Sequence, residues 1–218
     1  MSSYEIISFD LFNTLVYVER KPFYDFKKSL EDIWRLVDSY SVDLSFDIFY
    51  NAYRSNYKAK QEELLAPTVN AHYKEQTLQQ FIVDIFAQNN LGNSLELDEL
   101  AFQMAMMYFR ENLEDIYLYP EVKQLLATLK EKDYLLVLTS DHSWPPNGYD
   151  VLNKFDIGKF FENVVFSGEA GYRKPSPVIF EKAIEGIALS SRDNFLHVGD
   201  SYYSDVRGAI RLAGRLYG

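Results

Sequence analysis

Short apolar runs, each ending in a polar residue and a loop, recur along the chain and predict its core. Four segments of this kind cover residues 5–9, 134–138, 163–166 and 195–199. Such runs, separated by helical patterns such as residues 121–130, predict a doubly wound parallel β-sheet. Because ligands bind beyond the carboxyl ends of the strands in such a sheet, we expect Asp10, Thr139 and Asp200 to converge there.

The pattern changes between residues 21 and 115, where apolar positions recur every three or four residues, as on one face of a helix. The stripes comprise Phe23, Phe26, Leu30, Ile33, Trp34 and Val37, then Phe46, Phe49, Tyr50 and Tyr53, then Leu78, Ile82, Ile85 and Phe86. We therefore predict an α/β fold in which a Rossmann-like core, residues 1–18 and 116–218, carries an inserted all-helical cap, residues 19–115. We interpret the aromatic residues of the insertion as packing its own core.

Composition narrows the classes of function that fit the chain. Its 218 residues, 47% of them hydrophobic, suffice for one sizeable core and a smaller accessory unit. The net charge of −10 argues against nucleic-acid binding and requires a local positive focus for any small anionic substrate. The absence of cysteine excludes disulfides and thiolate chemistry. With neither a signal peptide nor a run of membrane-spanning length, we expect a cytoplasmic protein without membrane contact.

Three acidic residues are candidate metal ligands. Carboxylates that converge at the ends of neighbouring parallel strands repel one another, so a cation or a proton has to accompany them. The oxygens of Asp10, Asp200 and Asp205 suit Mg²⁺, which binds carboxylates together with carbonyl groups and water. As a group, these three residues predict a magnesium site.

Three further residues are candidates for binding an anion. Lys174 precedes Pro175, which favours an extended loop conformation, and its ammonium would offset the charge of a carboxylate and a bound anion. Thr139 and Ser140 follow a predicted strand and offer a hydroxyl and an amide to an anionic oxygen. Taken alone, Lys174 is an ordinary solvated surface charge, and Thr139 and Ser140 are ordinary loop residues.

The order of these pieces resembles the four-motif series of the haloacid dehalogenase-like hydrolase superfamily. The matching segments are Asp10-Leu11-Phe12-Asn13-Thr14-Leu15, Leu138-Thr139-Ser140, Arg173-Lys174-Pro175 and His197-Val198-Gly199-Asp200-Ser201-Tyr202-Tyr203-Ser204-Asp205. A helical cap inserted after the first motif is similar to that of haloacid dehalogenases and phosphoglycolate phosphatases. The resemblance implies Asp10 as nucleophile, Thr139, Ser140 and Lys174 as phosphate-binding residues, and Mg²⁺ held by Asp10, Asp200, Asp205 and the Phe12 backbone carbonyl.

Phe12 departs from the family's phosphatases, which usually carry an aspartate there as general acid and base. Losing such a group typically costs about 10²- to 10⁴-fold in rate. Three interpretations stay open: an atypical magnesium-dependent phosphatase, a 2-haloacid dehalogenase-type hydrolase, and a weak or inactive member that binds a phosphorylated ligand or partner. An aromatic residue at this position is similar to the dehalogenases, whereas the intact acidic pattern of Asp200 and Asp205 counts against them.

We predict hydrolysis of a small phosphorylated metabolite, a phosphate monoester, through an aspartyl-phosphate on Asp10. Another group then has to supply the acid, and the candidates are Asp141, His142, Tyr17, Glu19 and Arg20. The sequence leaves the substrate and the oligomeric state open. Because the chain ends soon after the last motif, we expect a final edge strand to be short, missing or truncated.

Overall fold

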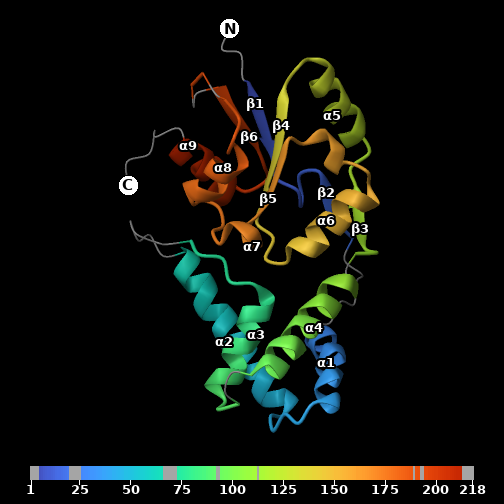
Figure 1. The fold of residues 1–218 in the computed structure, drawn as a ribbon, viewed down its shortest axis with the longest axis vertical. Coiled ribbons are helices and arrows are strands. Elements are labelled where there is room, and N and C mark those ends of the chain that lie inside the picture. The colour runs from blue at the N-terminus through green and yellow to red at the C-terminus, as the bar shows by residue number, and fades with distance from the viewer. Residues whose placement is uncertain are drawn as a thin grey trace. The chain divides into compact units, whose positions relative to one another are not determined.

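A computed structural model describes residues 5–19, 26–65, 73–91, 94–111, 113–188, 190–191 and 194–212 (Figure 1). The chain divides into two compact units. The core unit comprises Met1–Glu19, His72–Glu75 and Asp115–Gly218, and the helical unit comprises Arg20–Ala71 and Gln76–Glu114. No helix among the described residues is long and apolar enough to cross a lipid bilayer.

A parallel sheet forms the centre of the core unit (Figure 1). Its described strands are β1 (Ile6–Phe9), β4 (Leu135–Ser140), β5 (Asn163–Phe166) and β6 (Phe195–Val198), in the spatial order β5-β4-β1-β6. All these pairings are parallel, which confirms the predicted sheet. Phe9 lies opposite Leu138 on one side and Val198 on the other, so Asp10, Thr139 and Gly199, the next residues, lie at one level of the sheet.

Helices pack against the sheet and extend its buried core. They are α5 (Val122–Glu131), α6 (Pro145–Lys154), the 3₁₀ turn η2 (Gly158–Phe160), α7 (Ser167–Ala170), α8 (Pro177–Ala183), the π-helical turn η4 (Tyr202–Val206) and α9 (Arg207–Leu212). Pro145 and Pro177 occupy the first turns of α6 and α8, where a missing amide costs no helical hydrogen bond. From α8, Phe180 packs with Ile6 and Val137 of the sheet in a buried apolar cluster.

The core unit also contains a short antiparallel strand pair that the sequence pattern did not predict. β2 (Val16–Val18) pairs with β3 (Ile116–Leu118), which places Tyr17 opposite Tyr117. The ring centroid of Tyr17 lies 5.7 Å from that of Tyr117 and 4.9 Å from that of Tyr119. The chain forms β2 just before it enters the helical insertion and β3 just after it returns, so the pair joins the two ends of the insertion.

A segment in the middle of the insertion, Tyr73–Glu75, belongs to the core unit although it lies in the range that we assigned to the cap. Its backbone runs antiparallel to the Gly171–Arg173 loop. The Glu75 amide donates to the Gly171 carbonyl at 3.0 Å, and the Arg173 amide donates to the Tyr73 carbonyl at 2.8 Å. The hydroxyls of Tyr73 and Tyr203 lie 3.2 Å apart, which ties the segment to the η4 turn as well.

The helical unit consists, in its described part, of α1 (Phe26–Trp34), the 3₁₀ helix η1 (Arg35–Ser39), α2 (Phe46–Leu65), α3 (Leu78–Gln88) and α4 (Leu95–Glu111). Residues of the predicted stripes form its core: Phe49, Ile82, Ile85 and Phe86 are buried, and the rings of Trp34 and Phe49 lie 4.5 Å apart. Thr77 begins α3 with a reciprocal capping box to Gln80. Phe23, Arg20 and the Phe26 side chain lie outside the described residues.

Candidate active site

Three carboxylates converge beyond the carboxyl ends of β1 and β6. One oxygen each from Asp10, Asp200 and Asp205 lies within 4.8 Å of the others. Asp10 follows β1 and is fixed by its amide, which donates to the Val198 carbonyl at 2.9 Å. Asp10 and Asp205 are buried and Asp200 is exposed. Like charges this close require a compensating cation or proton.

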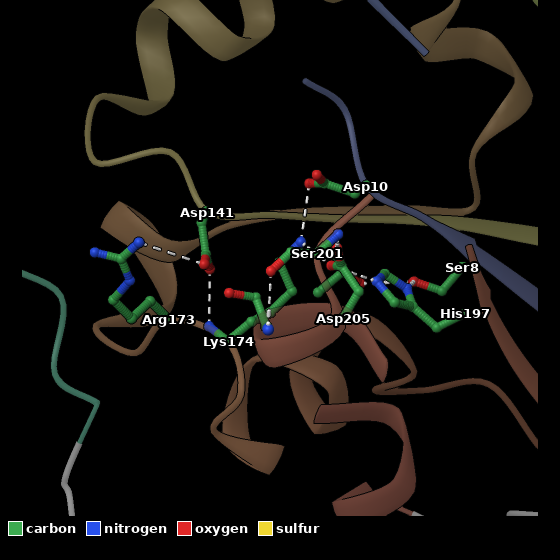
Figure 2. Close-up of polar contacts among 10 residues, drawn as sticks. Ser8, Asp10, Asp141, Arg173, Lys174, His197, Ser201 and Asp205 are labelled. Carbon is green, nitrogen blue, oxygen red and sulfur yellow. Dashed lines mark hydrogen bonds and ion pairs between the residues drawn. The ribbon is translucent and has the colours of Figure 1, made fainter. Parts of the chain in front are cut away.

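Lys174 supplies one positive charge to this cluster (Figure 2). Its ammonium lies 2.9 Å from Asp10 Oδ1 and 2.5 Å from Asp205 Oδ1, and only 3% of the residue is exposed. Burial alone would lower the pKa of Lys174, but the charges of Asp10, Asp141 and Asp205 outweigh it and raise that pKa. Lys174 is therefore a fixed cation and not a proton donor at neutral pH.

Asp205 is held in place by hydrogen bonds that the sequence pattern did not predict. The Ser201 amide donates to its Oδ2 at 2.8 Å, and His197 Nε2 lies 2.9 Å from its Oδ1. Burial would raise the pKa of Asp205, but the hydrogen bond to His197 and the charge of Lys174 hold it well below its ordinary value. Gly199 makes room for this carboxylate, because a Cβ there would lie 2.2 Å from Asp205 Cγ.

A line of buried polar side chains continues from Asp205 beneath the site. His197 Nδ1 lies 2.9 Å from Ser8 Oγ, and Ser8 Oγ lies 3.0 Å from Thr139 Oγ1. Burial lowers the pKa of His197, so the imidazole is neutral and donates its Nε2 proton to Asp205. Sequence reasoning assigned no role to Ser8 or His197; their only signal was a polar residue within each apolar strand. Ser140, the last residue of β4, is buried beside Thr139.

The Phe12 ring packs against His142. Their centroids lie 5.2 Å apart with the rings tilted by 35°, and this buried imidazole also makes an edge-type contact with Phe166, with the centroids 5.9 Å apart. His142 Nε2 lies 3.1 Å from Asn147 Oδ1. Burial lowers the pKa of His142 to about 4, so the ring is uncharged at neutral pH. Position 12, two residues after Asp10, where the family's phosphatases usually carry a carboxylate, therefore holds an apolar ring.

Asp141 lies beside the Lys174 backbone (Figure 2). Its Oδ1 accepts the Lys174 amide at 2.8 Å, its Oδ2 lies 3.6 Å from the Arg173 guanidinium, and 16% of its side chain is exposed. Burial raises the pKa of Asp141 to about 6, although the charges of Lys174 and Arg173 oppose the rise.

The donor set fits a magnesium ion. Asp10, Asp200 and Asp205 offer only oxygen, the ligand type that Mg²⁺ prefers, and one lysine does not neutralise three carboxylates. Asp10 Oδ1 is buried, and its contact with Lys174 is an ion pair without hydrogen-bond geometry, so this oxygen keeps coordinating capacity. Asp10, Asp200 and Asp205, with the backbone carbonyl of Phe12, would hold the ion.

Comparisons with known proteins agree with this arrangement. A family model described as haloacid dehalogenase-like hydrolase matches residues 4–212. A glyceraldehyde 3-phosphate phosphatase of Pyrococcus abyssi is 33% identical over 90 residues, which cover 41% of this chain and 37% of that protein. A phosphoserine phosphatase of Thermus thermophilus is 34% identical over 116 residues, 53% of this chain and 45% of that protein. The matched region spans less than half the length of either relative.

A solved structure shows the same fold over nearly the whole chain. The 2-haloacid dehalogenase of Pseudomonas syringae pv. tomato DC3000 superposes with a TM-score of 0.57 at 19% identity, covering 96% of this chain and 83% of that one. A likeness at this identity establishes the shared fold and leaves the chemistry to the residues of the site.

Proposed function

Since the chain belongs to the haloacid dehalogenase-like hydrolase family, we propose that it is a magnesium-dependent phosphatase of a small phosphate monoester. The observation that carries the proposal is the Asp10 carboxylate, which lies between a buried lysine and two further carboxylates. A nucleophile that attacks a phosphate needs its own negative charge offset and the charge of its substrate neutralised. Lys174 and the oxygen donors for a divalent cation meet these needs at one point.

Each side chain then has a defined part in the reaction. Asp10 attacks the phosphorus and forms an aspartyl-phosphate, which water hydrolyses in the second half of the reaction. Lys174 holds Asp10 in place and offsets its negative charge, because its ammonium lies 2.9 Å away. Thr139 and Ser140 lie at the end of β4, next to β1, and would orient the phosphoryl oxygens. A bound magnesium ion supplies charge neutralisation at the phosphoryl group.

The relatives support a small phosphorylated metabolite as the substrate. Both have names of phosphatases that act on phosphorylated metabolites. The net charge of −10 repels anions at long range, so binding depends on Lys174 and the metal as a local positive focus.

One assay series tests the proposal. Phosphate esters and 2-haloacids are incubated with the protein in magnesium or in chelator, alongside Asp10→Asn, which keeps the shape of the side chain but removes its nucleophilic charge. The matched control is Asp133→Asn on the surface of the core unit. We expect magnesium-dependent phosphate release that Asp10→Asn abolishes and Asp133→Asn leaves unchanged.

Two results would point elsewhere. Metal-independent halide release from 2-haloacids would establish dehalogenase chemistry on Asp10. If neither product forms but a phosphorylated compound raises the melting temperature, the protein is a binding member of the family.

A further inference from the structure

Asp141 lies in the segment that follows β4, as Phe12 lies in the segment that follows β1. Phe9 and Leu138 are partners in the parallel register, so Asp10 and Thr139 each follow a paired residue. Phe12 is two residues beyond Asp10, and Asp141 is two residues beyond Thr139. Asp141 therefore brings a carboxyl group to the segment after the neighbouring strand, at the same sequence offset as Phe12.

Lys174 links Asp141 to the nucleophile. Its backbone amide donates to Asp141 Oδ1 at 2.8 Å, while its ammonium lies 2.9 Å from Asp10 Oδ1 (Figure 2). The two carboxyl groups are thus fixed by opposite ends of one buried residue. They also interact electrostatically, because the Asp10 charge contributes to the raised pKa of Asp141.

Among the other described candidates for a proton donor, Glu19 is exposed beyond the end of β2, and the following three are committed elsewhere. His142 is neutral, buried and packed against the Phe12 ring, with Nε2 beside Asn147 Oδ1. His197 lies beneath the site, with Ser8 and Asp205 at its two nitrogens. The Tyr17 ring stacks in the β2–β3 pair.

We propose that Asp141 is the general acid and base of the phosphatase reaction, in place of a carboxyl group at position 12. This inference rests on the proposed function and deepens it. When the Asp10 carboxylate bonds to phosphorus, the bond from phosphorus to the leaving oxygen breaks, and that oxygen takes the Asp141 proton and departs as an alcohol. In the second step the Asp141 carboxylate takes a proton from water as the water oxygen bonds to phosphorus. The Asp10–phosphorus bond breaks, and inorganic phosphate leaves.

The charge environment of Asp141 suits both steps. Burial raises the pKa of Asp141 to about 6. The positive charges of Lys174 and Arg173 lower this pKa, whereas the negative charge of Asp10 raises it. An acid–base group works best when its pKa lies near the working pH, because both protonation states are then accessible. Neutral His142 adds no charge beside it.

The test compares leaving groups in Asp141→Asn, whose amide oxygen still accepts the Lys174 amide. The substrates are p-nitrophenyl phosphate, which releases a stable phenolate without a proton, and glycerol 3-phosphate, which releases a poor alkoxide. The parameter is kcat/KM, because it reports steps up to departure of the leaving group. For glycerol phosphate we expect a loss of about 10²- to 10⁴-fold, whereas p-nitrophenyl phosphate changes far less.

A second variant tests whether the pH dependence of kcat/KM follows the pKa of Asp141. The acid has to be protonated, so kcat/KM for glycerol phosphate falls as pH rises through the pKa of Asp141. Arg173→Gln removes a charge that lowers this pKa, so the fall moves to higher pH.

Equal losses for both substrates would overturn the proposal and leave Asp141 as a support for the Lys174 loop. No loss, or an unshifted pH profile in Arg173→Gln, would also overturn it. Failure of the proposed function itself looks different: wild-type protein would then release no phosphate from either ester, or Asp10→Asn would retain the activity.

Discussion

Replacing Lys174 by methionine removes the ammonium between two buried carboxylates and keeps an unbranched side chain of similar length. In the wild-type protein Lys174 lies 2.9 Å from Asp10 and 2.5 Å from Asp205, with 2% of its side chain exposed. Removing one partner of a buried ion pair costs about 3–5 kcal/mol, because the remaining charge is left uncompensated. For a chain of this size that corresponds to a fall in melting temperature of about 6–20 °C.

The assay is urea unfolding in chelator, followed by circular dichroism at several pH values. The pKa of Asp205 is lowered in the folded protein, so its carboxylate contributes stability above its unfolded pKa, and this contribution is lost as pH falls toward the folded value. Without the Lys174 charge the folded pKa of Asp205 rises. The difference between variant and wild type should therefore be largest near neutral pH and shrink as the solution is acidified.

Lys159→Met is the matched control, since Lys159 pairs with Asp156 on the surface, where 59% of its side chain is exposed. Exposed pairs contribute little, so this variant should unfold close to the wild-type midpoint. If Lys174→Met were as stable as Lys159→Met in chelator at neutral pH, the ammonium would not hold the carboxylates together, and the electrostatic account of the site would be wrong.

Three other outcomes follow from the geometry. In Gly199→Ala the new methyl group would lie 2.2 Å from Asp205 Cγ, so the carboxylate has to move and calorimetry should show weakened magnesium binding; wild-type affinity would contradict this. In an Asp141→Asn background, Phe12→Asp should recover turnover of glycerol 3-phosphate by about 10²-fold or more, and no recovery would mean that a carboxyl group at position 12 cannot reach the leaving oxygen. Thr77→Ala removes the cap of α3 and should lower the free energy of unfolding by about 1 kcal/mol in urea titrations, while an unchanged midpoint would show that the cap adds nothing.

The sheet could be predicted because its strands carry their own signal. Residues 6–9 and 135–138 are almost entirely apolar, and a strand buried on both faces needs no partner sequence to be recognised. The order of polar residues after the strands likewise placed Asp10 and Asp200 at one edge, and the structure brings them together with Asp205.

Contacts between distant segments could not be predicted from the sequence pattern in this way. β2 and β3 have three residues each and pair across the whole insertion, so no local periodicity marks them. Asp141 could be named from the sequence only as one of five candidate acids, because its contact with the Lys174 backbone forms only in the folded chain. The role of His197 depends in the same way on Ser8, 189 residues away.

The Tyr73–Glu75 segment changes the topology of the insertion. Its backbone bonds to Gly171 and Arg173 fix the middle of the inserted chain to the core, so residues 20–71 and 76–114 form two closed loops instead of one. A polypeptide anchored at three points responds to cleavage differently from one anchored at two. A single proteolytic nick within either loop would leave the other loop attached at both ends, and the pairing of β1 with β4 and β6 should keep the two fragments associated.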